Sequence, residues 1–306
     1  MIVAITGANG FIGRHLCRRF AAAGWDVRPI VRADYVAERV SALVKGADVL
    51  IHAAGATRAR SATVMHRSNV TLTKRTLDAA LRAGVQRFVF ISSQAAAGPA
   101  PSRESIVDEN TPPVPVEEYG RSKLAAESEV KAVRLPWTIV RPAAVYGPGD
   151  RDFLQMFRLA RHGLAIYPGT RDHWLSIAHV RDIVDGIFSA ATNPRAERRT
   201  YFLGGPEPQQ WRWLFHAAAR AAGQLVRAEA NVPGWLVRIA ARAGDIKATF
   251  SGRVGLLTTE KARLGKPAFW ICSSERARRE LDFAPRVALQ DGLRETYLWY
   301  RKAGWL

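Results

Sequence analysis

The sequence has few cysteines and no long apolar run, and each shortage narrows the class of protein. Its two cysteines, Cys17 and Cys272, fit neither a metal site nor a disulfide framework, so we expect no bound metal. No apolar run is long enough to span a bilayer. An apolar strand begins at residue 2, which leaves no place for a signal peptide. We therefore expect a reduced, cytoplasmic protein.

Acidic residues and lysines are also scarce. The 306 residues hold 27 acidic against 45 basic side chains, a net charge of +18, and arginine supplies most of the excess. The excess either reflects genome composition or favours an anionic substrate or surface. The charges are scattered and no nucleic-acid motif occurs, so we expect no nucleic-acid partner. Residues 235–242 have the pattern of an amphipathic helix, which we interpret as a lid or packed surface element in preference to a membrane contact.

Glycine is concentrated directly after the first apolar run. Residues 2–5 predict a buried parallel strand, residues 6–13 hold three glycines, and residues 14–23 have helical periodicity. A glycine turn between a strand and a helix is the context that a dinucleotide-binding loop requires. The helix N-terminus would then face the cofactor phosphates. The cofactor residues predicted here are Gly7, Asn9, Gly10, Phe11, Ile12 and Gly13.

The residue after the second predicted strand, 27–31, bears on the choice of cofactor. An acidic side chain at this place would bind the ribose 2′-hydroxyl of NAD. Arg32 stands there instead, and an arginine can pair with the 2′-phosphate of NADP. Asp34 is a competing ribose ligand. The sequence therefore favours NADP, with NAD as a possible alternative.

Tyr119 and Lys123 are four residues apart on a predicted helix at about 117–133, so both can face one cleft. A nearby ammonium should lower the pKa of the phenol and fit Tyr119 for acid–base chemistry at a carbonyl or carbinol oxygen. Ser93 ends the strand predicted at 87–93, where parallel sheets bind ligands. Its hydroxyl can bond the same substrate oxygen. These three residues are the predicted catalytic group.

Strands alternate with helices through the first two-thirds of the chain, which predicts an α/β fold with a doubly wound parallel sheet. The strand predicted at 48–55 ends in small residues that leave space for a dinucleotide. These small residues are Ala53, Ala54 and Gly55.

The motifs together resemble the extended short-chain dehydrogenase/reductase family. The matching stretches are 6–13, 46–54, 69–73, the set Ser93, Tyr119 and Lys123, and the segments 141–150 and 179–182. The resemblance implies a Rossmann-type fold with a smaller mixed C-terminal substrate lobe, and a homodimer formed through the helices near 70–83 and 117–133. It also implies that Asn69 maintains a proton relay, and that Tyr119, Lys123, Pro142 and Val145 contact the cofactor.

One stretch departs from the family pattern. Family members usually carry a helix and a third strand between the second strand and the match to Asp48. Here about fifteen residues separate Arg32 from Asp48, enough for one helix at 36–44. We therefore expect the third strand to be missing or shortened.

Two kinds of reaction compete within this family. Nucleotide-sugar 4-epimerases, which hold NAD tightly, usually have an asparagine where this chain has Ala143 and Ala144, and an Arg-Asp pair in the region of 175–178. The chain more closely resembles dihydroflavonol reductases and 3β-hydroxysteroid dehydrogenases. A non-catalytic dinucleotide sensor is a third hypothesis, which the presence of both Tyr119 and Lys123 disfavours.

The prediction is thus an NADP(H)-dependent oxidoreductase that interconverts a carbonyl and a secondary alcohol on a ring-bearing or lipid-like small molecule. The Rossmann domain is predicted at 1–165 with 177–203, and the substrate lobe at 166–176 and 204–306. The predicted substrate-binding residues are Ser93, Gln94, Tyr146, Phe153, His173 and Trp174, and the aromatic wall would extend to Tyr167, Trp211 and Trp235.

Overall fold

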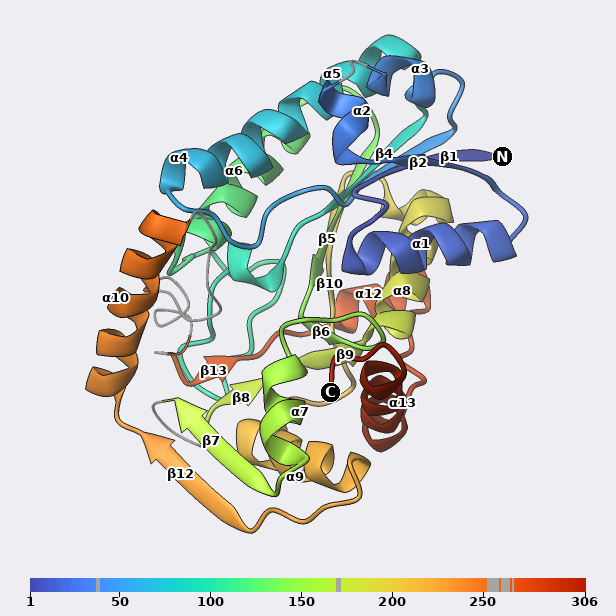
Figure 1. The fold of residues 1–306 in the computed structure, drawn as a ribbon. Helices are drawn as coiled ribbons and strands as arrows, with labels where there is room; N and C mark the ends of the chain where they lie inside the picture. Colours follow the sequence, from blue (N-terminus) through green and yellow to red (C-terminus); the bar gives the residue numbers. More distant parts are fainter. Residues whose placement is uncertain (37–38, 169–171, 252–258, 260–264, 266) are drawn as a thin grey trace.

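The first strand and the glycine loop begin a parallel sheet that organises the molecule. The computed structural model describes residues 1–36, 39–168, 172–251, 259, 265 and 267–306 (Figure 1). Six parallel strands lie in the order β10-β5-β4-β3-β1-β2. They are β1 (Ile2–Thr6), β2 (Asp26–Ile30), β3 (Val49–His52), β4 (Arg87–Ile91), β5 (Trp137–Pro142) and β10 (Arg199–Leu203).

Helices cover both faces of this sheet because alternate strand residues point to opposite sides. On one face, α1 (Phe11–Ala22), α8 (Val180–Thr192) and α12 (Glu275–Leu281) pack over Val3, Ile5 and Ile51. On the other face, α3 (Val40–Val44), α5 (Leu72–Ala83) and α6 (Glu118–Ala132) pack over Ala4 and Leu50. The doubly wound α/β prediction is confirmed.

The chain leaves β1 to form β2 on one side and then crosses to β3 on the other. The carboxyl end of β1 is therefore the point where the strand order reverses, which is where open α/β sheets bind ligands. The described residues between β2 and β3 form two short helices, α2 (Arg32–Val36) and α3, and no strand. The expected loss of the third strand is confirmed, and β2 forms one edge of the sheet.

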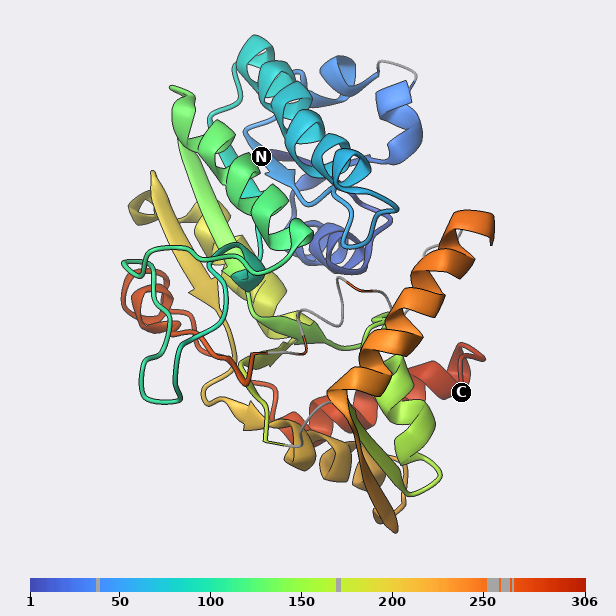
Figure 2. The ribbon, with the colours of Figure 1, turned by 90° about the vertical axis from the view of Figure 1, so that its left-hand side faces the viewer.

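A smaller lobe of short sheets and helices lies beyond the carboxyl ends of the strands (Figures 1 and 2). Its aromatic core includes Phe157, Tyr167 and Phe215. Its strands are β6 (Ala144–Tyr146), β7 (Leu164–Pro168), β8 (Trp174–Leu175), β9 (Ile177–His179), β11 (Gln209–Gln210), β12 (Ala228–Val232) and β13 (Phe269–Trp270). Its helices are α7 (Leu154–Ala160), α9 (Trp211–Ala221), α10 (Gly234–Ser251) and α13 (Leu289–Lys302).

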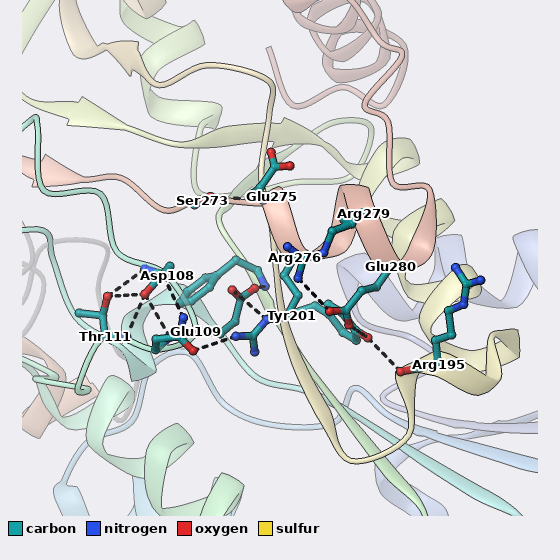
Figure 3. Close-up of polar contacts among 12 residues, drawn as sticks. Asp108, Glu109, Thr111, Arg195, Tyr201, Ser273, Glu275, Arg276, Arg279 and Glu280 are labelled. Atoms are coloured by element: carbon teal, nitrogen blue, oxygen red, sulfur yellow. Dashed lines mark hydrogen bonds and ion pairs between the residues drawn. The ribbon is translucent and has the colours of Figure 1, made fainter.

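The proline-rich and acidic segment 98–116 is fixed to the C-terminal part of the chain (Figure 3). Asp108 forms a turn by accepting hydrogen bonds from Asn110 and Thr111. Glu109 Oε1 accepts the Phe202 amide at 2.9 Å, and Glu109 Oε2 lies 3.6 Å from Arg276 Nε. The loop thereby ties α12 to β10, the other edge strand of the sheet.

The predicted boundaries between the Rossmann domain and the substrate lobe, at residues 165, 177 and 203, stay a prediction. Within the described residues, no helix is both long enough and apolar enough to cross a membrane.

Candidate active site

The glycine loop closes tightly against the end of β3. Gly7 has φ +69°, a backbone conformation that favours glycine, and a methyl group there would lie 2.7 Å from the Ala54 nitrogen. A methyl group on Gly13 would overlap the Gly7 carbonyl oxygen. Both glycines are therefore required by packing, and Ala53 and Ala54 lie directly beside the loop.

The N-terminus of α1 is open to an anion. Gly10 occupies the N-cap without a side-chain cap, and the first turn holds no acidic residue. Asn9 and Gly10 are exposed, whereas Phe11 and Ile12 are half-buried. Free amides and the positive end of the helix dipole suit a pyrophosphate group, so this cradle fits the predicted dinucleotide.

Two charged side chains, an arginine and a carboxylate, follow β2 and differ in their exposure and hydrogen bonding. Arg32 is exposed at the start of α2. Asp34 is buried, and its oxygens accept the Val31 amide at 2.8 Å and Arg39 Nη2 at 2.7 Å. The carboxylate is thus engaged within the protein, while the Arg32 guanidinium faces solvent.

Asn69 lies in a π-helical turn, Arg67–Thr71, that follows α4 (Ala62–His66). Its side-chain nitrogen donates to Ser122 Oγ at 2.8 Å and to the Ala56 carbonyl at 3.0 Å, and its oxygen accepts the Ala56 amide. Ser122 in turn donates to the Tyr119 carbonyl at 2.7 Å. Such turns are frequent at functional sites, and here Asn69 connects the loop after β3 with the first turn of α6.

Ser93, Tyr119 and Lys123 gather at the carboxyl end of β4. Helix α6 begins where the buried Glu117 carboxylate accepts the amides of Tyr119 and Gly120, which sets the direction of the first turn. The Ser93 hydroxyl lies near enough to the Tyr119 phenol to act on its pKa. Lys123 Nζ donates to the Ile91 carbonyl at 2.6 Å and lies 4.3 Å from the Phe90 ring centroid. The sequence-predicted catalytic group is therefore brought together.

The pKa values of this group differ from the expectation. Burial raises the pKa of Tyr119 to about 12, the Ser93 hydroxyl opposes that rise, and the Glu117 and Asp152 carboxylates add to it. Burial lowers the pKa of Lys123 to about 7, and Glu127 opposes the change. The expected lowering of the Tyr119 pKa is thus reversed, because carboxylates and burial act on the phenol while Lys123 bonds a backbone carbonyl.

A buried ion pair below this group was not predicted. Arg141 Nε and Nη2 donate to Glu127 Oε1 at 2.9 Å and Oε2 at 2.7 Å, and Ser92 Oγ donates to Oε1 at 2.5 Å. Glu127 follows Lys123 by one turn of α6, so the pair fixes α6 to β4 and β5. The only signal in the sequence is the four-residue spacing from Lys123, which is common on helices.

His52 is a second residue that the sequence did not single out. It is fully buried at the end of β3, with Nδ1 2.7 Å from Thr6 Oγ1 and Nε2 3.1 Å from Thr73 Oγ1. Thr6 also accepts the Ala54 amide at 3.2 Å. Burial, followed by the Lys123 charge, lowers the pKa of His52 to about 3. The neutral ring therefore connects the strand before the glycine loop with α5.

The remaining predicted residues lie in different surroundings. Gln94 is buried beside Ser93, and its side-chain nitrogen has no hydrogen-bond partner among the residues that the structure describes. Tyr146 and Phe153 belong to the buried core of the lobe. Trp174 and His173 are half-buried, and the guanidinium of Arg103 lies 4.0 Å from the Trp174 ring centroid.

Three further predicted contacts are also placed by the structure. Pro142 ends β5, Val145 is half-buried in β6, and Gly55 lies against Asn69, whose Oδ1 would be 2.8 Å from a methyl group on that glycine. Trp235, predicted as part of the aromatic wall, is instead exposed on α10. A cavity of about 190 Å³ lies between the start of α8 and the turn before α13; it is lined by one predicted residue, Tyr146, and by others that include His179, Asp182 and Arg286.

Comparison with known proteins places this geometry in context. A model of the NAD dependent epimerase/dehydratase family matches residues 3–204. Ceramide reductase of Caulobacter vibrioides is 32% identical over 330 aligned residues, which cover 100% of this chain and 96% of the relative. A second relative is the 4-hydroxy-2-methyl-3-oxo-4-farnesyl-3,4-dihydroquinoline-1-oxide ketoreductase of Stigmatella aurantiaca. It is 31% identical over 320 residues, which cover 94% of this chain and 93% of the relative.

A solved structure, MoeE5 in complex with UDP-glucose and NAD, has a TM-score of 0.79 and covers 99% of each chain. Its sequence identity is 23%, so the likeness concerns the fold.

Proposed function

The chain belongs to the NAD-dependent epimerase/dehydratase family and is an NAD(P)-dependent enzyme of the extended short-chain dehydrogenase/reductase type, and on that premise we propose that it reduces a ketone on a lipid-like molecule with NADPH. The observation that carries the proposal is the gathering of Ser93, Tyr119 and Lys123 at the carboxyl end of β4, where Lys123 Nζ donates to the Ile91 carbonyl and the Ser93 hydroxyl acts on the Tyr119 phenol. Both relatives named above are reductases whose names specify lipid-like substrates, which supports that class for this chain.

Tyr119 is proposed as the proton donor. A bound nicotinamide dinucleotide supplies hydride to the carbonyl carbon. With a pKa of about 12, Tyr119 keeps its proton at neutral pH and can give it to the carbonyl oxygen. Ser93 donates a hydrogen bond to the same oxygen. A phenol that holds its proton favours the reductive direction.

Lys123 and Asn69 are proposed to support this step. Lys123, with a pKa of about 7, can take or release a proton near neutral pH and can also hold ribose hydroxyls. Asn69 holds the first turn of α6 through Ser122 and so fixes the position of Tyr119. Gln94, buried beside Ser93, offers its amide to the substrate.

The remaining contacts to the dinucleotide are proposed from the cradle described above. Arg32, exposed beside the engaged Asp34, is proposed to bind the 2′-phosphate, which is the basis for choosing NADPH over NADH. The proposed cofactor residues are Gly7, Asn9, Gly10, Phe11, Ile12, Gly13, Arg32, Ala53, Ala54, Gly55, Tyr119, Lys123, Pro142 and Val145.

A nucleotide-sugar 4-epimerase remains the alternative outcome of the test. Ala143 is buried between β5 and β6 and offers no amide to a sugar. Ser176 Oγ is engaged with the Cys272 backbone, at 3.0 Å from its amide nitrogen. Both observations weigh against a nucleotide-sugar site at these positions.

The first experiment combines cofactor titration with turnover. NADPH should bind more tightly than NADH, and long-chain ketones should be reduced. Tyr119→Phe should lower kcat by roughly 10²- to 10⁴-fold, because the transferred proton is lost. Tyr297→Phe on α13 is the matched control. Full turnover by Tyr119→Phe would refute the mechanism, and copurifying NAD with activity on UDP-sugars would favour the epimerase.

A further inference from the structure

Helix α10 carries an apolar face that the fold leaves uncovered. Trp235, Leu236 and Ile239 are 55%, 41% and 57% exposed, although their side chains are large and apolar. On a helix these three lie on one side, because Ile239 follows Trp235 by four residues and Leu236 by three. Ala241, on the opposite side, is buried. Over residues 235–242 the helix therefore packs through Ala241 and presents its large apolar side chains to the surroundings.

The position of α10 makes this face accessible. The helix forms the left margin of the molecule in Figure 1 and faces the viewer in Figure 2, away from the parallel sheet. It follows β12, whose residues Ala228–Asn231 are exposed as well. A flat partner can thus approach the helix along residues 235–242, whose exposure the structure describes.

Basic side chains border the apolar face. Arg238 and Arg242 are exposed, are four residues apart, and lie on the side next to Trp235. The wider segment 211–242 holds five arginines and a single acidic residue, Glu229, in a chain of net charge +18. An apolar strip of Trp, Leu and Ile bordered by arginines complements a surface that is apolar beneath anionic headgroups.

The exposure of these side chains speaks against the lid or packed element expected at 235–242, and we propose instead that α10 binds the surface of an anionic lipid bilayer. Trp235, Leu236 and Ile239 enter the boundary between headgroups and acyl chains, and Arg238 and Arg242 contact phosphate groups. The contact is peripheral. It fits the lipid-like substrate proposed above but does not depend on it, because it rests on the exposure and charge of α10.

The test uses the full chain and vesicle flotation. Vesicles of equal parts phosphatidylglycerol and phosphatidylcholine should bind the protein, and vesicles of phosphatidylcholine alone should bind it roughly tenfold less or weaker still. The triple variant Trp235→Ser/Leu236→Ser/Ile239→Ser should lose roughly tenfold or more of the binding to anionic vesicles. Leu298→Ser on α13, 52% exposed, is the matched control and should bind like the unaltered protein.

Further measurements separate folding and other partners from lipid binding. The affinity of the triple variant for NADPH, or for NADH if that is the cofactor, reports whether its fold is intact. Arg238→Ala/Arg242→Ala should weaken binding and reduce its dependence on salt. Equal binding by the triple variant and the unaltered protein would overturn the proposal, as would absence of binding to anionic vesicles. Sedimentation without vesicles that shows self-association lost only in the triple variant would assign the face to a second copy of the chain instead.

Because vesicle binding is measured without turnover, a failed ketone assay leaves this test intact. Conversely, an active reductase that ignores anionic vesicles would refute the membrane contact alone.

Discussion

His52 is a buried histidine that must remain neutral for the fold to stay intact. Its ring has hydroxyl partners on both nitrogens and stacks 5.8 Å from the Phe90 ring centroid. The pKa of about 3 in the folded chain lies below the ordinary value of 6.5, so the unfolded chain takes up the proton first. The stability contributed by the neutral ring is present above about pH 6.5 and is lost as the pH falls toward 3.

We therefore predict that His52→Gln lowers the free energy of unfolding at pH 7. On acidification, however, the variant should lose less of its remaining stability than the unaltered protein. Between pH 7 and about pH 4.5, the unaltered protein should lose roughly 2 to 3 kcal/mol more than the variant, because only it carries this proton linkage. Urea unfolding at both pH values measures the difference. Parallel pH dependence in the two proteins would show that His52 does not titrate as described.

Arg32 is the residue on which the choice of cofactor depends. Removing its guanidinium should weaken the affinity for NADPH by roughly tenfold to a hundredfold, which is the range of a charge-assisted hydrogen bond. The affinity for NADH should stay nearly unchanged. Nicotinamide fluorescence titration of Arg32→Ala measures both affinities. Arg18→Ala, an exposed arginine on α1, controls for the loss of one positive charge. Equal losses for both cofactors would contradict a phosphate contact.

At the scale of single residues, the sequence predicted which residues come together in the site better than it predicted their surroundings. The four-residue spacing of Tyr119 and Lys123, and the placing of Ser93 at a strand end, were sufficient to gather the three residues. The predicted direction of the Tyr119 pKa shift was wrong, because the shift depends first on the burial of the phenol and then on the Glu117 and Asp152 carboxylates. Contacts between residues far apart in the chain, such as Thr6 with His52, are set only when the sheet forms.

At the scale of elements, α6 is held by one buried charged group. The Glu127 carboxylate binds Arg141 of β5 and Ser92 after β4, and all three side chains are buried. We predict that Arg141→Met costs about 3 to 5 kcal/mol of stability, because the buried carboxylate then keeps only the Ser92 hydroxyl and the Lys131 ammonium at 3.9 Å as partners.

The double variant Glu127→Gln/Arg141→Met should recover much of that loss, because neither charge is then left alone. Arg121→Met, which breaks the exposed ion pair with Glu118, should change stability by about 0.5 kcal/mol or less. Chemical denaturation of the variants measures these differences. If the double variant were as unstable as the sum of Glu127→Gln and Arg141→Met, the two residues would not act as a pair.

Elements with strong periodicity were predictable, and the elements of the lobe were not. Apolar runs and the glycine turn located β1, α1 and β3, and the short spacing from Arg32 to Asp48 was enough to infer the missing strand. The two-residue strands β8, β11 and β13 carry no periodic pattern, because each is defined by its partner across the lobe. The π-helical turn at Asn69 depends on the side-chain bonds of that residue.

At the scale of the whole molecule, the resemblance implies a homodimer formed through α5 and α6. Leu81 on α5 is 45% exposed and is the apolar residue that such an interface would cover. We predict a dimer in analytical ultracentrifugation, and a monomer for Leu81→Asp, because a buried unpaired charge opposes association. Leu298→Asp on α13 should remain dimeric. A monomeric unaltered protein, or a dimeric Leu81→Asp variant, would contradict this arrangement.

The shortened sheet has a consequence for the behaviour of the protein in concentrated solution. An uncovered edge strand can pair with a strand of another molecule and start aggregation. At the β2 edge, Pro29 has no amide hydrogen to offer, and the charged Asp26 and Arg28 flank it. At the β10 edge, the Phe202 and Gly204 amides already donate to Glu109 and to Ser274 Oγ. Both edges are thus closed to strand addition, so losing the third strand does not make the protein prone to edge-to-edge aggregation.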